Sequence, residues 1–247
     1  MTKSEIQLIK SLSDKRARTE TGLFLAEGEK LISEIRESDL RLRKIYSLEG
    51  IFEGDNVEWV APREMERISQ LKSANNSIAI VDIPRYTLDV ETLSQKLTLM
   101  LDSVQNPGNL GTIIRLADWF GIENIICSPS SADCFNPKVV QATMGAITRV
   151  KVHYLPLEET LTEIKELNVP IYGTLLEGEN IYSEPLTEEG VIIMGNEGQG
   201  ISEEVQQFIS HKLFIPPYPA DIAGSESLNV SIATAVVCSE FRRRLSM

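Results

Sequence analysis

The stretch LTLMLDSVQNPGNLGTIIRLADWFG, residues 97–121, carries the pattern that decides the fold. It opens with an apolar run, Leu97 to Leu101, which predicts a buried strand. A loop with a Pro-Gly pair follows. A helical apolar pattern then begins at Leu110 and ends at Gly121, a residue type that commonly closes helices. The stretch is therefore a strand–loop–helix unit, the repeating element of a parallel α/β sheet.

The same alternation continues along the rest of the chain. We expect further strands at 124–127, 150–154, 170–175, 191–194 and 213–215. We expect helices after Pro137, at 157–167, after Ser202 and at about 229–243. Strands that alternate with helices imply a largely parallel sheet covered on both faces. Such sheets bind ligands beyond the carboxyl ends of their strands, so the chemistry is expected in those loops.

The first third of the chain predicts a second, smaller α/β domain. Apolar residues from Ile6 to Leu12 have a helical spacing, and the apolar run at 77–81 predicts a strand. The polar stretch that follows begins with a proline and has no strong period, which is typical of a linker. We therefore divide the chain into a small domain at 1–83, a linker at 84–96 and a larger domain at 97–247.

Composition limits the possible classes of protein. Hydrophobic residues make up 42% and charged residues 24%, as in ordinary globular domains. No apolar run reaches the roughly 20 residues of a membrane span, and the first residues lack an apolar signal-peptide core. We therefore expect a cytoplasmic protein without membrane contact. The three cysteines form no C-x-x-C pair and the two histidines stand far apart, so no metal site is expected.

The net charge of −12 argues against an extended nucleic-acid surface, because typical nucleic-acid binders have a basic footprint. Net charge says little about its distribution, however, and a local patch can attract RNA to an acidic protein. One candidate basic patch lies near the N-terminus and consists of Lys10, Lys15, Arg16 and Arg18. A solvated helix end and turn explains the same residues.

Two of the loops that follow predicted strands combine glycines with polar residues. The loop at 105–115 holds Asn109 near a helix start and Arg115 about one and a half turns further on, a pattern that a helix cap and a surface cation also explain. The loop MGNEGQGIS, 194–202, has the order G-x-x-G-x-G, which matches neither a dinucleotide fingerprint nor a phosphate loop. Its Glu197 would repel phosphate and suits a cationic ligand such as a methyl sulfonium.

A third segment, 215–237, passes through three prolines to Ser227 and Asn229, both of which are good helix caps. An apolar face follows on the predicted helix, consistent with either core packing or a dimer contact. It consists of Ile232, Ala233, Val236 and Val237.

Together, these loops resemble the SpoU/TrmH-type RNA 2′-O-ribose methyltransferase family of the SPOUT superfamily. The Asn109-to-Arg115 stretch resembles the first family motif, IIMGNEGQGIS the second and SLNVSIATA, 227–235, the third. FNPKVVQATMGAI, 135–147, resembles the segment between them. The resemblance covers the chain from about Leu97. SLSDKR and FLAEGEKLI are similar, more loosely, to the family's small substrate-binding domain.

The resemblance implies a fold and a cofactor that periodicity does not reveal. The catalytic domain is expected to contain a deep trefoil knot, a feature otherwise nearly absent from proteins. S-adenosylmethionine is expected to bind bent within it, and the protein to act as a homodimer with its sites at the interface. The methyl acceptor is expected to be a ribose 2′-hydroxyl of rRNA or tRNA. The implied cofactor-binding residues are Gly173, Thr174, Leu175, Gly195, Asn196, Gly198, Ile215 and Leu228.

The family's functional positions correspond to five residues here: Asn109, Arg115, Glu197, Ser227 and Asn229. Because an arginine guanidinium stays protonated in proteins, we interpret Arg115 as binding phosphate and stabilising the developing alkoxide rather than as a base. Ser227 and Asn229 would order the site, and Glu197 would hold the cofactor loop and the arginine.

Alternatives remain beside this interpretation. A non-catalytic RNA-binding or ribosome-assembly protein would keep the fold, and a relative acting on a base nitrogen would share many motifs. A dinucleotide oxidoreductase lacks its fingerprint here. The loop at 216–224 is longer than the family's usual connection, and the sequence names neither its role nor the RNA, the target nucleotide or the cofactor affinity.

Overall fold

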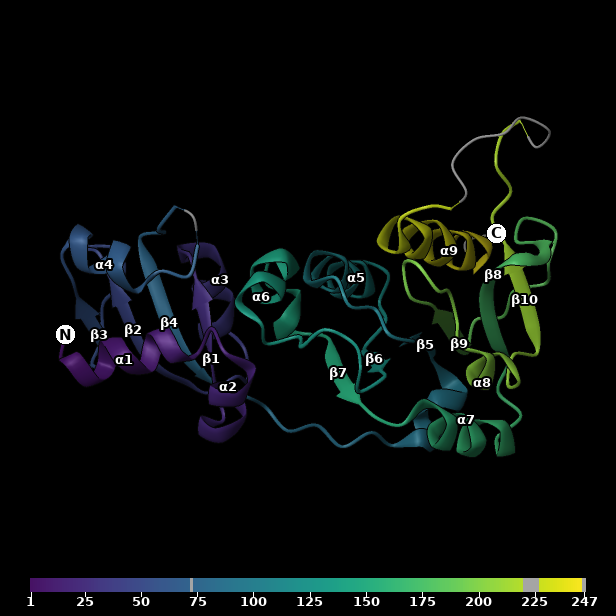
Figure 1. Ribbon diagram of the computed structural model, residues 1–247, viewed down its shortest axis with the longest axis horizontal. Helices are drawn as coiled ribbons and strands as arrows, with labels where there is room; N and C mark the ends of the chain where they lie inside the picture. The colour runs from purple at the N-terminus through teal and green to yellow at the C-terminus, as the bar shows by residue number, and fades with distance from the viewer. Residues whose placement is uncertain (72, 220–226, 246–247) are drawn as a thin grey trace. The chain divides into compact units, whose positions relative to one another are not determined.

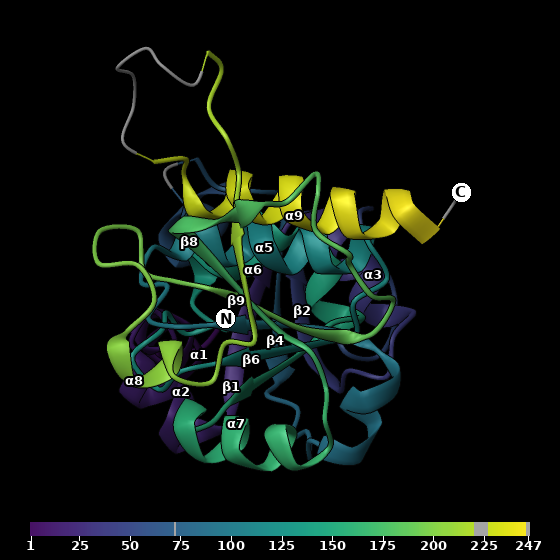
Figure 2. The same ribbon diagram turned by 90° about the vertical axis from the view of Figure 1, so that its right-hand side faces the viewer.

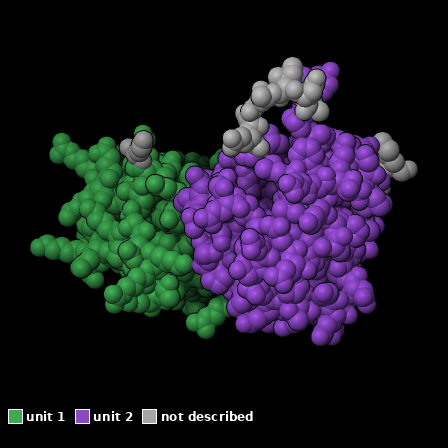
Figure 3. Space-filling view, turned by 45° about the vertical axis from the view of Figure 1, so that its right-hand side comes forward, with its two compact units in different colours: residues 1–85, 133–149 green, residues 86–132, 150–247 purple. Residues whose placement is uncertain are grey.

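Two compact units make up the described part of the chain. The computed structural model describes residues 1–71, 73–219 and 227–245. Unit 1 contains residues 1–85 and 133–149, and unit 2 contains residues 86–132 and 150–247 (Figure 3). The stretch 133–149, which the sequence pattern assigned to the larger domain, thus groups with the N-terminal residues.

Unit 1 is built on a mixed sheet with the strand order β1-β4-β2-β3. Its strands are β1 (Leu23–Glu27), β2 (Leu42–Ser47), β3 (Val57–Trp59) and β4 (Ser77–Asp82). The strand β4 runs antiparallel to β1 and β2, and β3 runs parallel to β2. Every residue of β1 is buried, because helices pack on both faces of the sheet.

The helices of unit 1 are α1 (Lys3–Ser11), α2 (Lys15–Thr21), α3 (Glu29–Arg36), α4 (Pro62–Ile68), α6 (Pro137–Thr143) and the 3-10 turn η2 (Ala146–Thr148). Apolar side chains of α1 and α4, among them Ile9 and Met65, join one core cluster with the sheet. The sequence pattern missed α2, because Lys15–Thr21 is polar and has no apolar period. Its N-cap, Asp14, accepts a hydrogen bond from the backbone N–H of Arg16.

Arg18 fixes the stretch 133–149 within unit 1. Its side chain is 2% exposed and donates two hydrogen bonds to Asp133 Oδ2, at 2.6 and 3.0 Å. It also donates to the backbone carbonyls of Leu12 and Ser13. The assignment of Arg18 to a basic RNA-binding patch was therefore wrong, because its guanidinium is buried and its hydrogen-bonding groups are used within the unit.

Two further contacts hold the same stretch. The rings of Phe24 in β1 and Phe135 lie 4.9 Å apart. At the other end, Arg149 Nη1 lies 3.0 Å from Glu34 Oε2 on α3. The segment that resembles part of the methyltransferase domain is therefore anchored at one end to β1 and at the other to α3.

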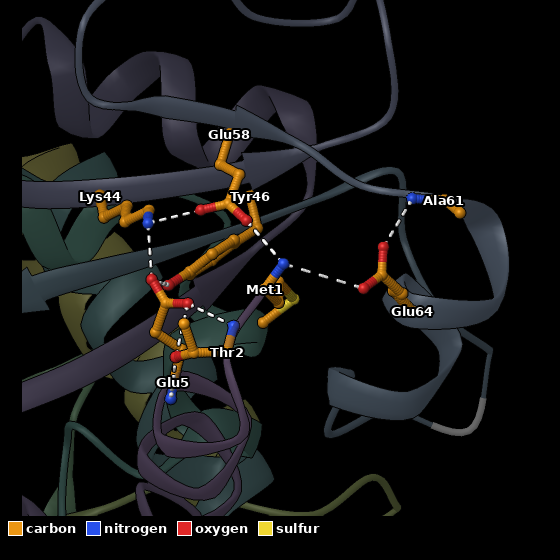
Figure 4. A network of polar contacts seen from close by, with 8 residues as sticks. All are labelled: Met1, Thr2, Glu5, Lys44, Tyr46, Glu58, Ala61 and Glu64. Carbon is orange, nitrogen blue, oxygen red and sulfur yellow. Dashed lines mark hydrogen bonds and ion pairs between the residues drawn. The ribbon is translucent and has the colours of Figure 1, made fainter.

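A polar network surrounds the start of α1 (Figure 4). Thr2 caps the helix, and Glu5 accepts hydrogen bonds from Lys44 Nζ at 2.7 Å and Tyr46 Oη at 3.0 Å. Lys44 Nζ also lies 2.6 Å from Glu58. The bond from Lys44 lowers the pKa of Glu5 to about 2, and burial together with Glu5 raises the pKa of Tyr46 to about 12.

Unit 2 is built on a parallel sheet with the strand order β10-β8-β9-β5-β6-β7. Its strands are β5 (Leu97–Leu101), β6 (Asn124–Cys127), β7 (Lys151–Tyr154), β8 (Ile171–Asn180), β9 (Gly190–Met194) and β10 (His211–Phe214). Each neighbouring pair is parallel, as the alternating pattern predicted. Because β5 and β9 are adjacent, the loops at their carboxyl ends emerge side by side.

Helices cover both faces of this sheet (Figures 1 and 2). One face carries α5 (Pro107–Trp119) and α9 (Val230–Leu245), and the other carries η1 (Val90–Gln95), α7 (Leu157–Glu166) and α8 (Glu203–Gln206). The second face encloses a core cluster in which Leu161 and Ile193 are fully buried. No described helix is long and apolar enough to cross a membrane.

The helix termini differ in detail from the sequence expectations. The N-cap of α5 is Asn106, not Asn109, and its Oδ1 accepts from the backbone N–H groups of Gly108 and Asn109. Ser202 precedes α8 as expected but makes no side-chain capping bond. Arg242, in the last turn of α9, donates to the carbonyls of Phe120 and Gly121 at the end of α5.

Candidate functional site

A chain of hydrogen-bonded side chains connects three loops of unit 2. Asn109 Nδ2 donates to Glu197 Oε1 at 2.8 Å, and Asn229 Nδ2 donates to Asn109 Oδ1 at 3.0 Å. Asn229 Oδ1 in turn accepts from the backbone N–H groups at the start of α9, as its expected role as a cap requires. Three of the five predicted catalytic residues therefore lie together, at the carboxyl edge of the sheet.

The loop after β9 closes on itself. Asn196 and Gly200 exchange two backbone hydrogen bonds, at 2.8 and 3.0 Å. A Cβ on Gly195 would lie 2.2 Å from the backbone carbon of Gly200, so this position requires glycine. Gly198 is different, because the nearest atom to a Cβ there would be 3.6 Å away. The closed loop presents exposed Glu197 on a fixed backbone.

Asn196 has a structural task within this loop. Its Oδ1 accepts from the backbone N–H groups of Gly198 and Gln199, at 2.8 and 3.0 Å. Its Nδ2 donates to the carbonyl of Ser103, at 2.7 Å. The side-chain amide, predicted as a cofactor contact, is thus engaged in holding the loops after β5 and β9 together.

Arg115 and Ser227 stand apart from the hydrogen-bonded chain. Arg115 is exposed on α5, and its guanidinium has no hydrogen-bond or ion-pair partner among the described residues. The carboxylate of Glu197 pairs with Asn109 and not, as we had interpreted it, with Arg115. Ser227 is exposed, two residues before the cap of α9. Because Arg115 is exposed and has no partner among the described residues, its guanidinium is available to an anionic ligand.

The strand β8 leaves the sheet near its middle. Tyr172 and Gly173 pair with the start of β10, and pairing resumes only at Glu179. The residues 174–178 between them have no partner on β10, which explains why the strand is longer than expected. Thr174 Oγ1 donates to the carbonyl of Ile193 at 3.1 Å. This excursion, residues 174–178, therefore has no register partner on β10, directly after the residues of β8 that pair with β9.

The remaining predicted cofactor residues lie on β8, after β10 and before α9. Leu175 lies within the excursion and is half-buried. Ile215 follows β10 directly and is half-buried, whereas Leu228 is 50% exposed. A Cβ on Gly173 would lie 2.2 Å from Ile209, so packing alone explains that glycine. The long loop at 216–224 is described only to Pro219, and its residues 220–224 lie outside the described residues.

Two polar residues of the site escaped the sequence analysis. Asn106 caps α5, and its backbone N–H lies 3.4 Å from Glu197 Oε1. Asp102 is 5% exposed, and its Oδ2 accepts from the backbone N–H of Ser202 at 2.8 Å. The Asn-Pro pair at 106–107 was a usable signal, since asparagine caps often precede proline at the first helical position. Among the described residues, no cluster of potential metal ligands occurs.

The comparisons identify the class of protein that has this parallel sheet and these loops: the S-adenosylmethionine-dependent RNA methyltransferases. The family model described as SpoU rRNA Methylase matches residues 96–239, and the MRM3-like substrate binding domain matches residues 3–83. The chain belongs to the SpoU rRNA methylase family. The predicted family, enzyme class and cofactor are confirmed. The comparisons also favour an enzyme over the non-catalytic RNA-binding alternative.

Individual relatives agree over nearly the whole chain. A TrmH-family protein from Porphyromonas gingivalis is 37% identical, with a TM-score of 0.87 and 99% of both chains covered. The 23S rRNA (guanosine(2553)-2′-O)-methyltransferase of Bacillus subtilis is 29% identical, with 94% of both chains covered. An AdoMet-bound rRNA methyltransferase from Sinorhizobium meliloti is 27% identical, with a TM-score of 0.85 and coverage of 99% of this chain and 96% of the other.

Proposed function

We propose that this enzyme transfers a methyl group to the 2′-hydroxyl of a nucleotide in 23S rRNA. The observation that carries the proposal is the side-chain relay Glu197–Asn109–Asn229 beside the closed glycine loop. The Bacillus subtilis relative, which is aligned over 94% of its length, supports the choice of 23S rRNA and of ribose. Transfer RNA and base-nitrogen targets become outcomes of the test.

The loops of unit 2 fit S-adenosylmethionine. The ligand carries a positive sulfonium and an adenine that needs backbone donors and acceptors. Exposed Glu197 offers a carboxylate, and the excursion at 174–178 offers peptide groups that β10 leaves unpaired. Gly195, Ile215 and Leu228 would border the ligand. When bound, S-adenosylmethionine supplies an electrophilic methyl group.

Arg115 is the residue that we assign to the acceptor RNA. An arginine guanidinium binds phosphate oxygens in a bidentate manner and stabilises negative charge on a developing alkoxide. The bound cofactor would supply its methyl group to the 2′-oxygen, and Arg115 would stabilise the negative charge on that oxygen as the hydroxyl proton is lost to solvent. Asn109, Glu197 and Asn229 orient the two loops, and Ser227 would order the region before α9. In-line geometry then supplies much of the rate.

Three wider features of the proposal follow from the family resemblance. We infer a deep trefoil knot in unit 2, a homodimer and a cytoplasmic location. Two exposed apolar side chains on the helices α5 and α9 support the dimer: Trp119 is 83% exposed and Ile232 is 52% exposed. We further infer that residues 1–83 bind the RNA substrate, that 84–96 link the two domains, and that the knotted catalytic domain lies within 97–247, apart from the stretch 133–149 that groups with unit 1.

The Arg115→Ala variant tests the assignment of this residue. We expect kcat to fall by about 100-fold or more, because one positively charged donor to the developing oxyanion is lost. Affinity for S-adenosylhomocysteine, measured by calorimetric titration, should stay near that of the wild type. Lys165→Ala, which removes an exposed cation on α7, is the matched control and should retain kcat. Wild-type methylation rates in Arg115→Ala would contradict the assignment.

A further inference from the structure

Ser103 has an unusual backbone conformation directly after β5. Its φ is 57°, in the left-handed region that non-glycine residues seldom adopt and that persists only where surrounding contacts hold it. The backbone N–H of Ser103 donates to Ser128 Oγ at 2.9 Å, and its carbonyl accepts from Asn196 Nδ2 at 2.7 Å. The loops after β6 and β9 therefore each bond one of the two backbone polar groups of Ser103.

A chain of hydroxyl groups ends on the same residue. Ser128 Oγ lies 2.9 Å from Ser130 Oγ, which lies 2.8 Å from Ser103 Oγ. Ser103 Oγ donates to Asp102 Oδ1 at 3.1 Å. If each hydroxyl donates to the next, the chain runs in one direction and ends on a carboxylate, and successive bonds then reinforce one another. Asp102 uses its other oxygen to hold Ser202.

The hydrogen bonds of Ser103 connect the loops after β5, β6 and β9, and Ser103 precedes the relay residue Asn109 in the same loop. Asn106 follows Ser103 by three residues and Asn109 by six. We propose that Ser103 is a positioning residue for methyl transfer, whose hydroxyl and left-handed backbone fix the loop of Asn109 against the loop of Glu197. The proposal rests on the proposed function. Ser103 acts through Asn109 and not on the reacting atoms.

Two substitutions separate the hydroxyl from the backbone. Glycine adopts the left-handed conformation freely but lacks the hydroxyl, whereas alanine lacks the hydroxyl and also resists the conformation. We expect kcat to fall about 10-fold in Ser103→Gly and about 100-fold in Ser103→Ala, because misplacement of a reacting group by about 1 Å has effects of this size. The KM for RNA and the affinity for S-adenosylhomocysteine should change little.

The control is Ser94→Ala, which removes a hydroxyl in η1 whose one hydrogen bond among the described residues is to the carbonyl of Glu91. It should leave kcat unchanged. Wild-type kcat in both Ser103 variants contradicts the proposal. So does a loss of kcat that runs parallel with losses of ligand affinity and thermal stability, because that pattern indicates a general structural defect.

A second readout does not depend on activity. The side-chain amide of Asn109 gives a pair of nuclear magnetic resonance signals, assigned by their loss in an Asn109→Asp variant. We expect these signals to shift in Ser103→Ala and to stay in place in Ser94→Ala. An unmoved pair in Ser103→Ala contradicts the proposal. If the wild type transfers no methyl group, the proposed function fails, and the amide signals still decide the role of Ser103.

Discussion

Asn109 has a fixed polarity in the relay, because its amide nitrogen must donate to Glu197 and its oxygen must accept from Asn229. Neither Asp nor any apolar residue fulfils both tasks opposite a carboxylate. The residue is half-buried at the third position of α5, where the backbone holds it in place. The strength of the relay therefore depends on the order of donors and acceptors along it.

Reversing that order provides a prediction. Asn109→Asp places two carboxylates about 2.8 Å apart, so we expect kcat to fall by about 100-fold. The double variant Asn109→Asp, Glu197→Gln restores one donor between the two loops and should recover most of the loss. A double-mutant cycle on kcat measures this coupling. Additive effects of the two substitutions would show that the side chains do not act as a pair.

The sequence predicted the relay residues only through the family motifs. Asn109, Glu197 and Asn229 lie far apart in the chain, and no local periodicity relates them. The cofactor contact of Asn196 stays a prediction, and the structure adds that its amide holds the loop, because a motif shows that a residue matters but not which atoms it contacts. Ser103 was missed, since no pattern signals a long-range hydrogen bond or a left-handed serine.

At the scale of elements, the loop after β9 depends on one close backbone approach. Gly195→Ala would force a Cβ to within 2.2 Å of the Gly200 backbone, so we expect the affinity for S-adenosylhomocysteine to fall by about 100-fold, as when a binding loop loses its geometry. Gln199→Ala, which shortens an exposed side chain in the same loop, is the matched control. Calorimetric titration compares them. Equal affinities in the two variants would mean that the closed loop does not shape the site.

The attachment of residues 133–149 gives a second prediction at this scale. Arg18→Ala leaves Asp133 and two carbonyls without their buried partner, and we expect the free energy of unfolding to fall by about 3–5 kcal/mol. Arg16 stands two residues away on α2 with an 85% exposed side chain, and Arg16→Ala should cost about 0.5 kcal/mol or less. Urea unfolding measures both. Similar midpoints for the two variants would contradict a structural role of Arg18.

Apolar runs in the sequence predicted the strands, and capping residues predicted where most helices begin. The predicted strand at 170–175 was too short, because the exposed acidic end of β8 shows no apolar signal for its return to the sheet. The helix α2 was missed because its residues are stabilised by Asp14, Gly22 and the buried Arg18 rather than by an apolar face. Contacts with residues distant in the sequence thus determine the secondary structure where no local sequence pattern indicates it.

For the whole molecule, ion pairs predict how stability depends on pH. Hydrogen bonds from Lys44 and Arg243 lower the pKa of Glu5 and of Glu240, respectively, to about 2, from an ordinary value of 4.5. A carboxyl group whose pKa is lower in the folded state stabilises the fold above its unfolded pKa, and this stability is lost as the pH falls. We therefore expect the urea concentration at the unfolding midpoint to decrease as the pH is lowered from 4.5 to 2.

The double variant Glu5→Gln, Glu240→Gln should flatten this dependence. Glu204→Gln removes an exposed carboxylate on α8 that has no hydrogen-bond or ion-pair partner among the described residues, and it should leave the curve unchanged. Added salt should weaken the effect, because the groups are close to solvent. An unchanged slope in the double variant would mean that other groups cause the acid transition.

The central claim is that the chain methylates ribose in 23S rRNA, and alkaline hydrolysis of the product tests it most directly. Purified protein is incubated with unmodified 23S rRNA and methyl-labelled S-adenosylmethionine, with transfer RNA in parallel, and the RNA is then hydrolysed in alkali. A 2′-O-methyl group blocks cleavage of the adjacent phosphodiester, so the account predicts label in an alkali-resistant dinucleotide from 23S rRNA. Label in mononucleotides, or in transfer RNA alone, would contradict it.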